Sequence, residues 1–125
     1  MIIQSRDAVV PYLTKDGSEI RELIHPAVHG NLAQSLAEAT IFPGCRTALH
    51  RHHRSEELYH VTAGAGRLTF GGETLLLHPG DTVCIPPGTP HCIEALGPIS
   101  LRVLCCCAPP YAHDDTELLE GPPVG

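Results

Sequence analysis

Short apolar runs, separated by glycine and proline, recur along most of the chain. Runs of this length with turn signals between them are typical of β-strands and leave no room for long helices. We expect strands within the following ranges: 33–42, 47–52, 57–62, 67–70, 74–77, 82–85, 91–96 and 99–106. The pattern therefore predicts an all-β protein, built as an antiparallel sandwich or barrel.

The segments that flank these runs have a different pattern. Residues 1–32 mix apolar and charged positions and predict an N-terminal arm with short strands, in which Asp16-Gly17 is a turn signal and 25–29 a loop. The barrel is expected over 33–110. Residues 111–125 contain four acidic residues and no lysine or arginine. They predict a solvated acidic tail with a disordered end, and a lid over a site is the alternative.

Length and charge narrow the class of protein. A chain of 125 residues and 13.4 kDa fits one domain, and a sequence without tryptophan needs an aliphatic core. Outside the tail, eight basic residues stand against ten acidic ones, so no basic face for nucleic acid is expected. No apolar run approaches the roughly 18 residues that span a bilayer, and the first residues do not resemble a secretory signal. We therefore expect no membrane partner and a cytoplasmic location.

The six cysteines favour free thiols over a disulfide framework. Cys105, Cys106 and Cys107 are adjacent, and neighbouring residues of a strand point to opposite faces. No Cys-x2-Cys pair indicates a zinc ribbon. The cysteines are interpreted as small buried hydrophobes in a reduced compartment. Cys105 and Cys107 face inward if Arg102, of opposite parity, faces solvent.

Three histidines and a glutamate carry the chemistry of the sequence. His50 and His52 are two residues apart, a spacing that puts both imidazoles on one face of a strand. Glu57 follows at an odd offset, so it must enter the site after a bend or from an adjacent strand. His91 follows a turn rich in proline and glycine. Such a set can bind a divalent first-row metal and leave positions open for water or substrate.

The spacing of these residues resembles the two motifs of the cupin superfamily, as found in its small single-domain members. The motifs are Gly44-x5-His50-x-His52-x4-Glu57-x6-Gly64 and Gly80-x5-Pro86-x-Gly88-x2-His91. The resemblance covers about residues 36–107 and implies a double-stranded β-helix, the jelly-roll barrel of cupins. It also implies the metal ligands, which are His50, His52, Glu57 and His91.

Two positions complicate the match. Glu56 is an alternative to Glu57, but only Glu57 lies seven residues before Gly64. Ala95 stands where the second motif usually has asparagine. Because that asparagine is not normally a ligand, its replacement affects local hydrogen bonding or a substrate contact rather than the metal.

The resemblance does not fix the reaction, because cupins include dioxygenases, decarboxylases, isomerases, lyases and non-catalytic sensors. We expect a metal-dependent enzyme that acts on a small polar organic molecule, with a dioxygenase as first choice. An isomerase or lyase, or a binding or sensing module, is the alternative. Iron or manganese is favoured over zinc, nickel or cobalt, because four protein ligands leave two open positions on an octahedral ion. The resemblance also implies a homodimer.

Two further side chains are candidates for contact with a substrate. Tyr59 lies two residues after Glu57 and is expected on the same face, where its phenol can act as acid, base or hydrogen-bond donor. The alternative is a wall residue. Arg67 can bind an anionic substrate if it faces inward, and a solvated side chain is the alternative.

Overall fold

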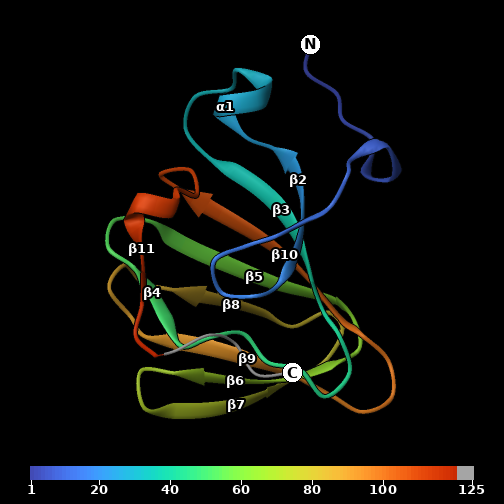
Figure 1. Ribbon diagram of the computed structural model, residues 1–125, viewed down its shortest axis with the longest axis vertical. Coiled ribbons are helices and arrows are strands. Elements are labelled where there is room, and N and C mark those ends of the chain that lie inside the picture. The colour runs from blue at the N-terminus through green and yellow to red at the C-terminus, as the bar shows by residue number, and fades with distance from the viewer. Residues whose placement is uncertain (121–125) are drawn as a thin grey trace.

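The computed structural model describes residues 1–120, whose regular structure is nearly all β and forms two sheets (Figure 1). One sheet has the order β1-β2-β3-β10-β5-β8 and the other the order β11-β4-β9-β6-β7. The strands are β1 (Tyr12–Leu13), β2 (Glu19–Ile24), β3 (Ser35–Ile41), β4 (His50–His52), β5 (Glu56–Ala63), β6 (Ala65–Phe70), β7 (Glu73–Leu77), β8 (Thr82–Ile85), β9 (His91–Leu96), β10 (Leu101–Ala108) and β11 (Thr116–Leu118). Short helices are η1 (Arg6–Ala8), α1 (Pro26–His29) and η2 (His113–Asp115).

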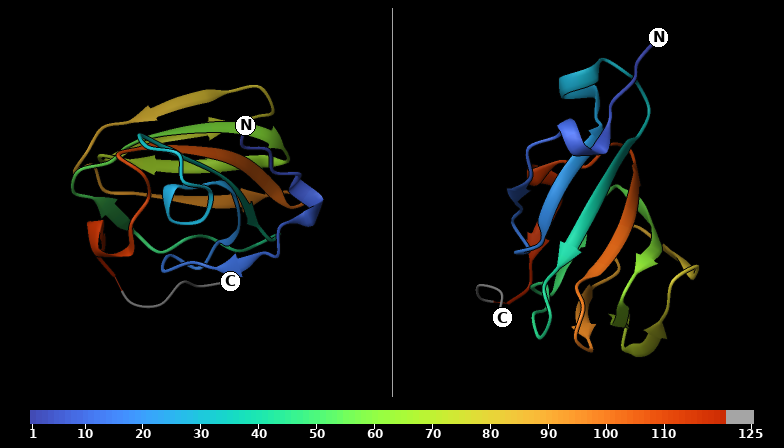
Figure 2. Two further views of the ribbon diagram at one scale, coloured as in Figure 1. Left: turned by 90° about the horizontal axis from the view of Figure 1, so that it is seen from above. Right: turned by 90° about the vertical axis from the view of Figure 1, so that its right-hand side faces the viewer.

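The chain changes sheet repeatedly, which closes the two sheets into a barrel (Figure 2). β3, β5, β8 and β10 belong to the first sheet, whereas β4, β6, β7 and β9 belong to the second. β10 lies between β3 and β5, and all pairs are antiparallel. The predicted all-β class and jelly-roll barrel are confirmed, and β8 and β9 match the expected ranges.

The core is aliphatic, as the composition predicts. Side chains of β5 and β9 alternate between buried and more exposed positions, the period of a strand with one face on a core. The most deeply buried hydrophobic side chains come from both sheets: Val61, Leu68, Ile85, Ile93, Leu101 and Val103.

The N-terminal arm is part of the first sheet, because β2 pairs with β3 over most of its length. The expectation of a loop at 25–29 was wrong, since Pro26–His29 form α1. Proline at the first helical position needs no hydrogen-bond acceptor, and His25 Nδ1 accepts a hydrogen bond from the Ala27 N–H at 3.0 Å. This local pairing favours one helical turn over a loop.

The acidic C-terminal segment is not a solvated tail over residues 113–118, so that expectation was wrong. β11 pairs with β4 and adds a strand to the second sheet. Asp115 is buried, and its carboxylate accepts hydrogen bonds from the backbone N–H groups of Arg54 and Ser55. Charge alone does not reveal that a carboxylate is needed to pair these N–H groups. The predicted disordered end at 121–125 lies outside the described residues.

The cysteines are only partly core residues. All six fall within the described range and are free thiols there. Cys107 is buried and Cys84 is exposed, and the other four are half-buried. The expectation of buried small hydrophobes therefore holds for Cys107 but was wrong for Cys84. Within residues 1–120, no helix is long and apolar enough to cross a membrane.

Gly64 sits where the chain passes from β5 to β6, against the start of β10. Its φ is +78°, and a Cβ built there lies 2.5 Å from the carbonyl oxygen of Ser100. Gly97 has a similar φ of +80°, but a Cβ there has no neighbour within 4 Å among the described residues. A side chain at either glycine is strained, and only at Gly64 does it also collide with backbone.

We expect Gly64→Ala to lower the free energy of unfolding by about 2–4 kcal/mol, the sum of positive-φ strain and overpacking. Gly97→Ala is the control and should cost only about 1–2 kcal/mol for the strain. Urea unfolding of both variants measures the difference. Equal losses would show that close approach to β10 does not restrict position 64.

Candidate metal centre

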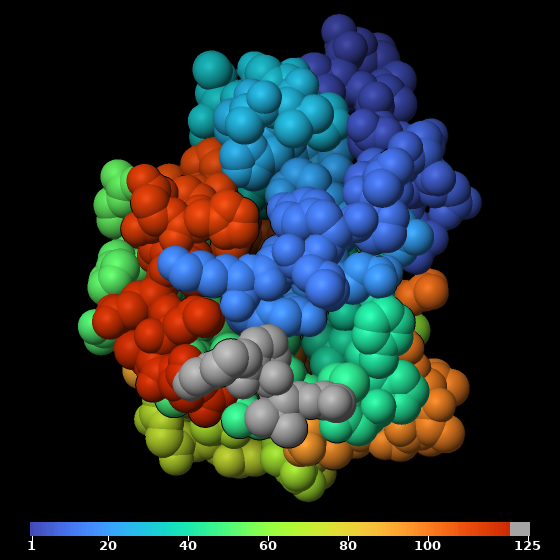
Figure 3. Space-filling view, viewed as in Figure 1, coloured from blue at the N-terminus to red at the C-terminus, as the bar shows by residue number. Residues whose placement is uncertain are grey.

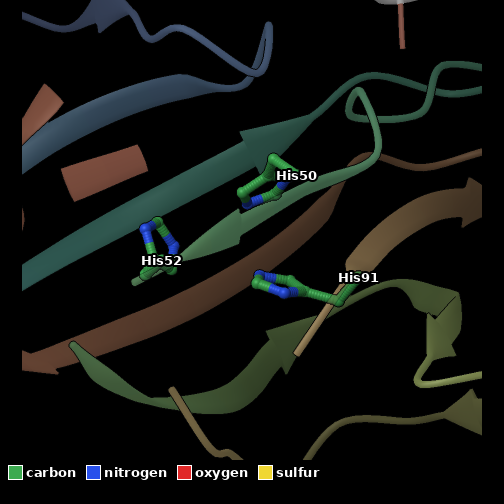
Figure 4. A group of neighbouring side chains, drawn as sticks. All are labelled: His50, His52 and His91. Carbon is green, nitrogen blue, oxygen red and sulfur yellow. The ribbon is translucent and has the colours of Figure 1, made fainter. Parts of the chain in front are cut away.

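β4 and β9 bring three imidazoles together inside the barrel. His50 and His91 are directly opposite each other in the antiparallel pair, and His52 lies on the same face of β4 as His50. One ring nitrogen from each histidine lies within 4.8 Å of the other two, and the rings turn toward a common space (Figure 4). All three side chains are at most 4% exposed. The cluster suggests a divalent metal.

Backbone carbonyls fix the orientation of two of these rings. His50 Nδ1 lies 2.7 Å from the carbonyl oxygen of Ala48, and His91 Nδ1 lies 2.9 Å from that of Thr89. A carbonyl only accepts hydrogen bonds, so each Nδ1 carries the proton that it donates. In the neutral ring, Nε2 then keeps a lone pair that faces the cavity. This is the tautomer that binds a metal through Nε2.

Thr116 orients the third ring in the same way. Its hydroxyl donates a hydrogen bond to the carbonyl oxygen of Ala112 at 2.9 Å and therefore accepts one from His52 Nδ1 at 2.9 Å. The acidic segment thus contributes a group that supports the site. Sequence reasoning missed this role because the two side chains are 64 residues apart.

Glu57 reaches the imidazoles from the other sheet, after the bend at 53–55 that its odd spacing predicts. Its Oε1 lies 3.2 Å from His52 Nε2 and 3.3 Å from His91 Nε2. Its Oε2 accepts a hydrogen bond from the Cys107 thiol at 3.3 Å. Glu56 is exposed, so Glu57 is the glutamate that faces the cluster.

Electrostatics at the cluster favour an ionised Glu57. Burial would raise the pKa of this carboxyl, but His52 and His91 outweigh burial and hold the pKa well below its ordinary value. Burial would likewise lower the pKa of His52, but Glu57 outweighs it and raises that pKa. Burial, with the neighbouring His91 as the second cause, lowers the pKa of His50, so that imidazole stays neutral.

Asp16 is a second carboxylate at the site, and sequence reasoning missed it. Its Oδ2 lies 3.4 Å from His50 Nε2. The sequence indicates only a turn at this position, which is 34 residues before His50 and carries no motif. The contact depends on how the N-terminal arm packs on the barrel.

When the three imidazoles are neutral, hydrogen-bond acceptors face one another in this cluster. Glu57 Oε1 and His91 Nε2 are buried and have no hydrogen-bond partner among the described residues. Buried acceptors without a donor are costly unless a cation lies between them. Ligand atoms about 2.1 Å from one ion lie roughly 3 Å apart at neighbouring positions and about 4 Å apart at opposite ones. The carboxylate oxygens lie 3.2 to 3.4 Å from the Nε2 atoms, and the three histidine nitrogens lie within 4.8 Å of one another. The residues present therefore fit a divalent metal.

A cavity of about 50 Å³ adjoins the imidazoles. Tyr59 lines it and is 5% exposed, and its ring centre lies 5.9 Å from that of His91. Burial raises the pKa of this phenol well above its ordinary value, so it stays protonated. Cys105 and Cys107 also line the cavity while Arg102 is exposed, as the parity of β10 predicts. The aliphatic part of the wall consists of Ile20, Ala37, Ala39, Ile41, Ile93 and Val103.

Arg67, Ala95 and the histidine that follows His52 lie outside the cavity. Arg67 is exposed and forms an ion pair with Glu94 at 2.9 Å, so it does not face a substrate. The His53 side chain is 49% exposed and lies 3.2 Å from Glu117, away from the imidazole cluster. Ala95 packs in the apolar core, where an asparagine side chain would need polar partners.

The support that Thr116 gives to His52 can be tested by Thr116→Val. We expect affinity for a divalent ion to fall about 10- to 100-fold, because His52 loses the acceptor that orients it. Thr116→Ser keeps the hydroxyl and should restore affinity. Thr40→Val changes a buried threonine outside the cavity and should leave affinity unchanged. Calorimetric titration of the metal-free proteins measures these constants, and an unchanged constant in Thr116→Val would remove Thr116 from the site.

Known proteins have this fold. The chain is 51% identical over 114 residues to the uncharacterized protein MJ1618 of Methanocaldococcus jannaschii, with 91% of each chain covered. Its structure is similar to that of the polyketide cyclase RemF from Streptomyces resistomycificus, with a TM-score of 0.81, 22% identity, and 97% of this chain and 87% of that chain covered. It is also similar to the nucleoside dehydratase Pac13 from Streptomyces, with a TM-score of 0.78, 14% identity, and coverage of 95% and 91%. The model of the cupin domain matches residues 37–107, and the chain therefore belongs to the cupin family.

Proposed function

We propose that the protein is a metal-dependent enzyme that acts on a small organic molecule with oxygen donors. His50, His52, Glu57 and His91 would hold the ion, which supplies Lewis-acid polarisation of a substrate oxygen when bound. One observation carries this proposal: three imidazoles and the Glu57 carboxylate meet in a buried cluster, where Glu57 Oε1 and His91 Nε2 have no hydrogen-bond partner among the described residues. A structural core would pair such atoms with N–H or O–H groups.

The protein's own residues would hold and orient the substrate. The apolar wall formed by Ile41, Ile93 and Val103 suits a carbon skeleton, while the metal centre would bind oxygen atoms of the substrate. Tyr59 faces the cavity next to His91, and its phenol would donate a hydrogen bond to a substrate oxygen. The Cys107 thiol would keep Glu57 in place through Oε2. Together these contacts favour a substrate with an apolar body and oxygen atoms at one end.

A redox-neutral reaction, of the lyase or isomerase class, is the form of this function that we favour. The site offers a cation position, a phenol donor and buried carboxylates, which are the groups needed to polarise a carbonyl or hydroxyl and stabilise the charge that develops. Similar structures whose activity is stated include a cyclase and a dehydratase, which agree with this choice.

A dioxygenase is the second candidate. The observation that favours it is the donor set itself, because three imidazoles and one carboxylate leave two positions open on an octahedral ion. Iron or manganese would fit that set better than zinc.

The expected homodimer and the expected cytoplasmic location stay predictions.

The test begins with protein purified without added metal and then loaded with iron(II), manganese(II) or zinc. We expect about one ion per chain by elemental analysis. Against a panel of hydroxy acids, diketones and phenolic compounds, we expect product by mass spectrometry without consumption of dioxygen. His91→Ala should lose both ion and turnover, whereas His53→Ala, which changes an exposed histidine, should keep both.

Tyr59→Phe separates ion binding from catalysis. It should keep the ion and lower kcat at least 10- to 100-fold, in line with loss of a group that assists proton transfer or charge stabilisation. Consumption of dioxygen in step with product would replace the first candidate with the second. Ligand binding without turnover would make the protein a binding module, and absence of any bound ion would reject the proposal.

A further inference from the structure

The two carboxylate oxygens of Asp16 have different surroundings. Oδ1 accepts hydrogen bonds within the arm, whereas Oδ2 accepts none there. The three bonds to Oδ1 come from the Thr14 hydroxyl at 2.7 Å, the Ser18 hydroxyl at 2.7 Å and the Ser18 N–H at 3.0 Å. Gly17, at a φ of +94°, closes this turn. The turn therefore fixes the carboxylate in one orientation, which leaves Oδ2 directed at the cavity.

The partner that Oδ2 faces is another acceptor. His50 donates through Nδ1 to a carbonyl, so its neutral imidazole has a lone pair on Nε2, 3.4 Å from Asp16 Oδ2. Glu57 Oε1 stands in the same relation to the Nε2 atoms of His52 and His91, at 3.2 and 3.3 Å. The Asp16 side chain is only 15% exposed, so water does not fully offset the repulsion. A cation shared by both carboxylates removes it.

The arm is fastened over the cavity at Asp16 and at the residue before it. The Ala48 N–H donates to the Asp16 carbonyl oxygen at 2.9 Å, which ties the turn to the segment just before β4. Lys15 Nζ donates to the carbonyl oxygens of His113 and Thr116 at 3.2 and 2.6 Å. In Figure 3 the blue arm crosses the front of the molecule beside the red C-terminal segment. The turn thus lies between the site and the surface.

We propose that Asp16 is a further carboxylate of the metal centre, carried by the N-terminal arm, so that ion binding fastens this arm to the barrel. The inference rests on the metal centre proposed above. Two carboxylates balance the charge of a divalent ion, and a second carboxylate oxygen makes the donor set harder, which favours iron or manganese over softer ions. The arm is then part of the site, and the ion adds a contact to the hydrogen bonds that already hold the arm over the cavity.

Asp16→Asn tests the role of Oδ2. Asparagine keeps an oxygen that accepts the hydrogen bonds of the turn and replaces the cavity-facing oxygen with an amide donor. We expect the dissociation constant for manganese(II) to rise at least 10-fold. Asp81→Asn is the matched control, because Asp81 also accepts a backbone hydrogen bond in a turn, from the His78 N–H, but does not line the cavity. Its dissociation constant should not change.

Hydrogen exchange of the unaltered protein gives an independent readout. Adding manganese(II) should slow exchange of the Gly17 and Ser18 amides, which are hydrogen-bonded within the turn. Exchange of the Asp81 amide, which is hydrogen-bonded to the His78 carbonyl oxygen in the turn between β7 and β8 and does not line the cavity, should stay the same. Asp16→Asn should lose the protection of the turn at saturating manganese.

The outcomes separate this inference from the proposed function. If the unaltered protein binds no divalent ion, both are overturned. If it binds manganese(II) but Asp16→Asn binds equally well, or the turn gains no protection, the metal centre stands and the role of Asp16 is rejected. A variant that fails to fold without metal is recognised by circular dichroism, and the exchange of the unaltered protein then decides.

Discussion

Buried hydrogen-bond acceptors repel one another unless positive charge lies between them, and this requirement shapes the centre of the barrel. Carbonyl oxygens and a threonine hydroxyl accept hydrogen bonds from Nδ1–H of the three histidines, which leaves each neutral ring with a lone pair on Nε2 that faces inward. Glu57 and Asp16 add carboxylate oxygens to the same place. The two sheets supply these acceptors from opposite sides, so the jelly roll is what holds them together.

Segments outside the barrel strands complete the centre. Thr116 orients His52 from the C-terminal segment, and the same segment holds Lys15 through two carbonyl oxygens. The arm in turn presents Asp16. The two flanks therefore act together over one cavity, which explains why an acidic stretch that looks solvated in the sequence is packed against β4. Stability of the flanks and function of the site are coupled in this arrangement.

The sequence predicts those features that depend on local pattern. Short apolar runs and the turn residues that flank them locate β8 and β9. The even spacing of His50 and His52 predicts that they share a face, and the odd spacing of Glu57 predicts the bend before it. It does not predict Asp16 or Thr116, whose partners lie 34 and 64 residues away and carry no spacing signal. The helix α1 was missed because its cap is a histidine, which is uncommon among capping residues.

The central claim is that one cation sits among the inward Nε2 atoms. Crystals of protein loaded with manganese(II) or iron(II), measured at the absorption edge of the metal, test it directly through the anomalous signal. We predict one peak at about 2.1 Å from Nε2 of His50, His52 and His91 and from a carboxylate oxygen of Glu57. An anomalous peak elsewhere, or no peak, would contradict the account. Nε2 atoms that accept hydrogen bonds from protein or water donors in place of an ion would also contradict it.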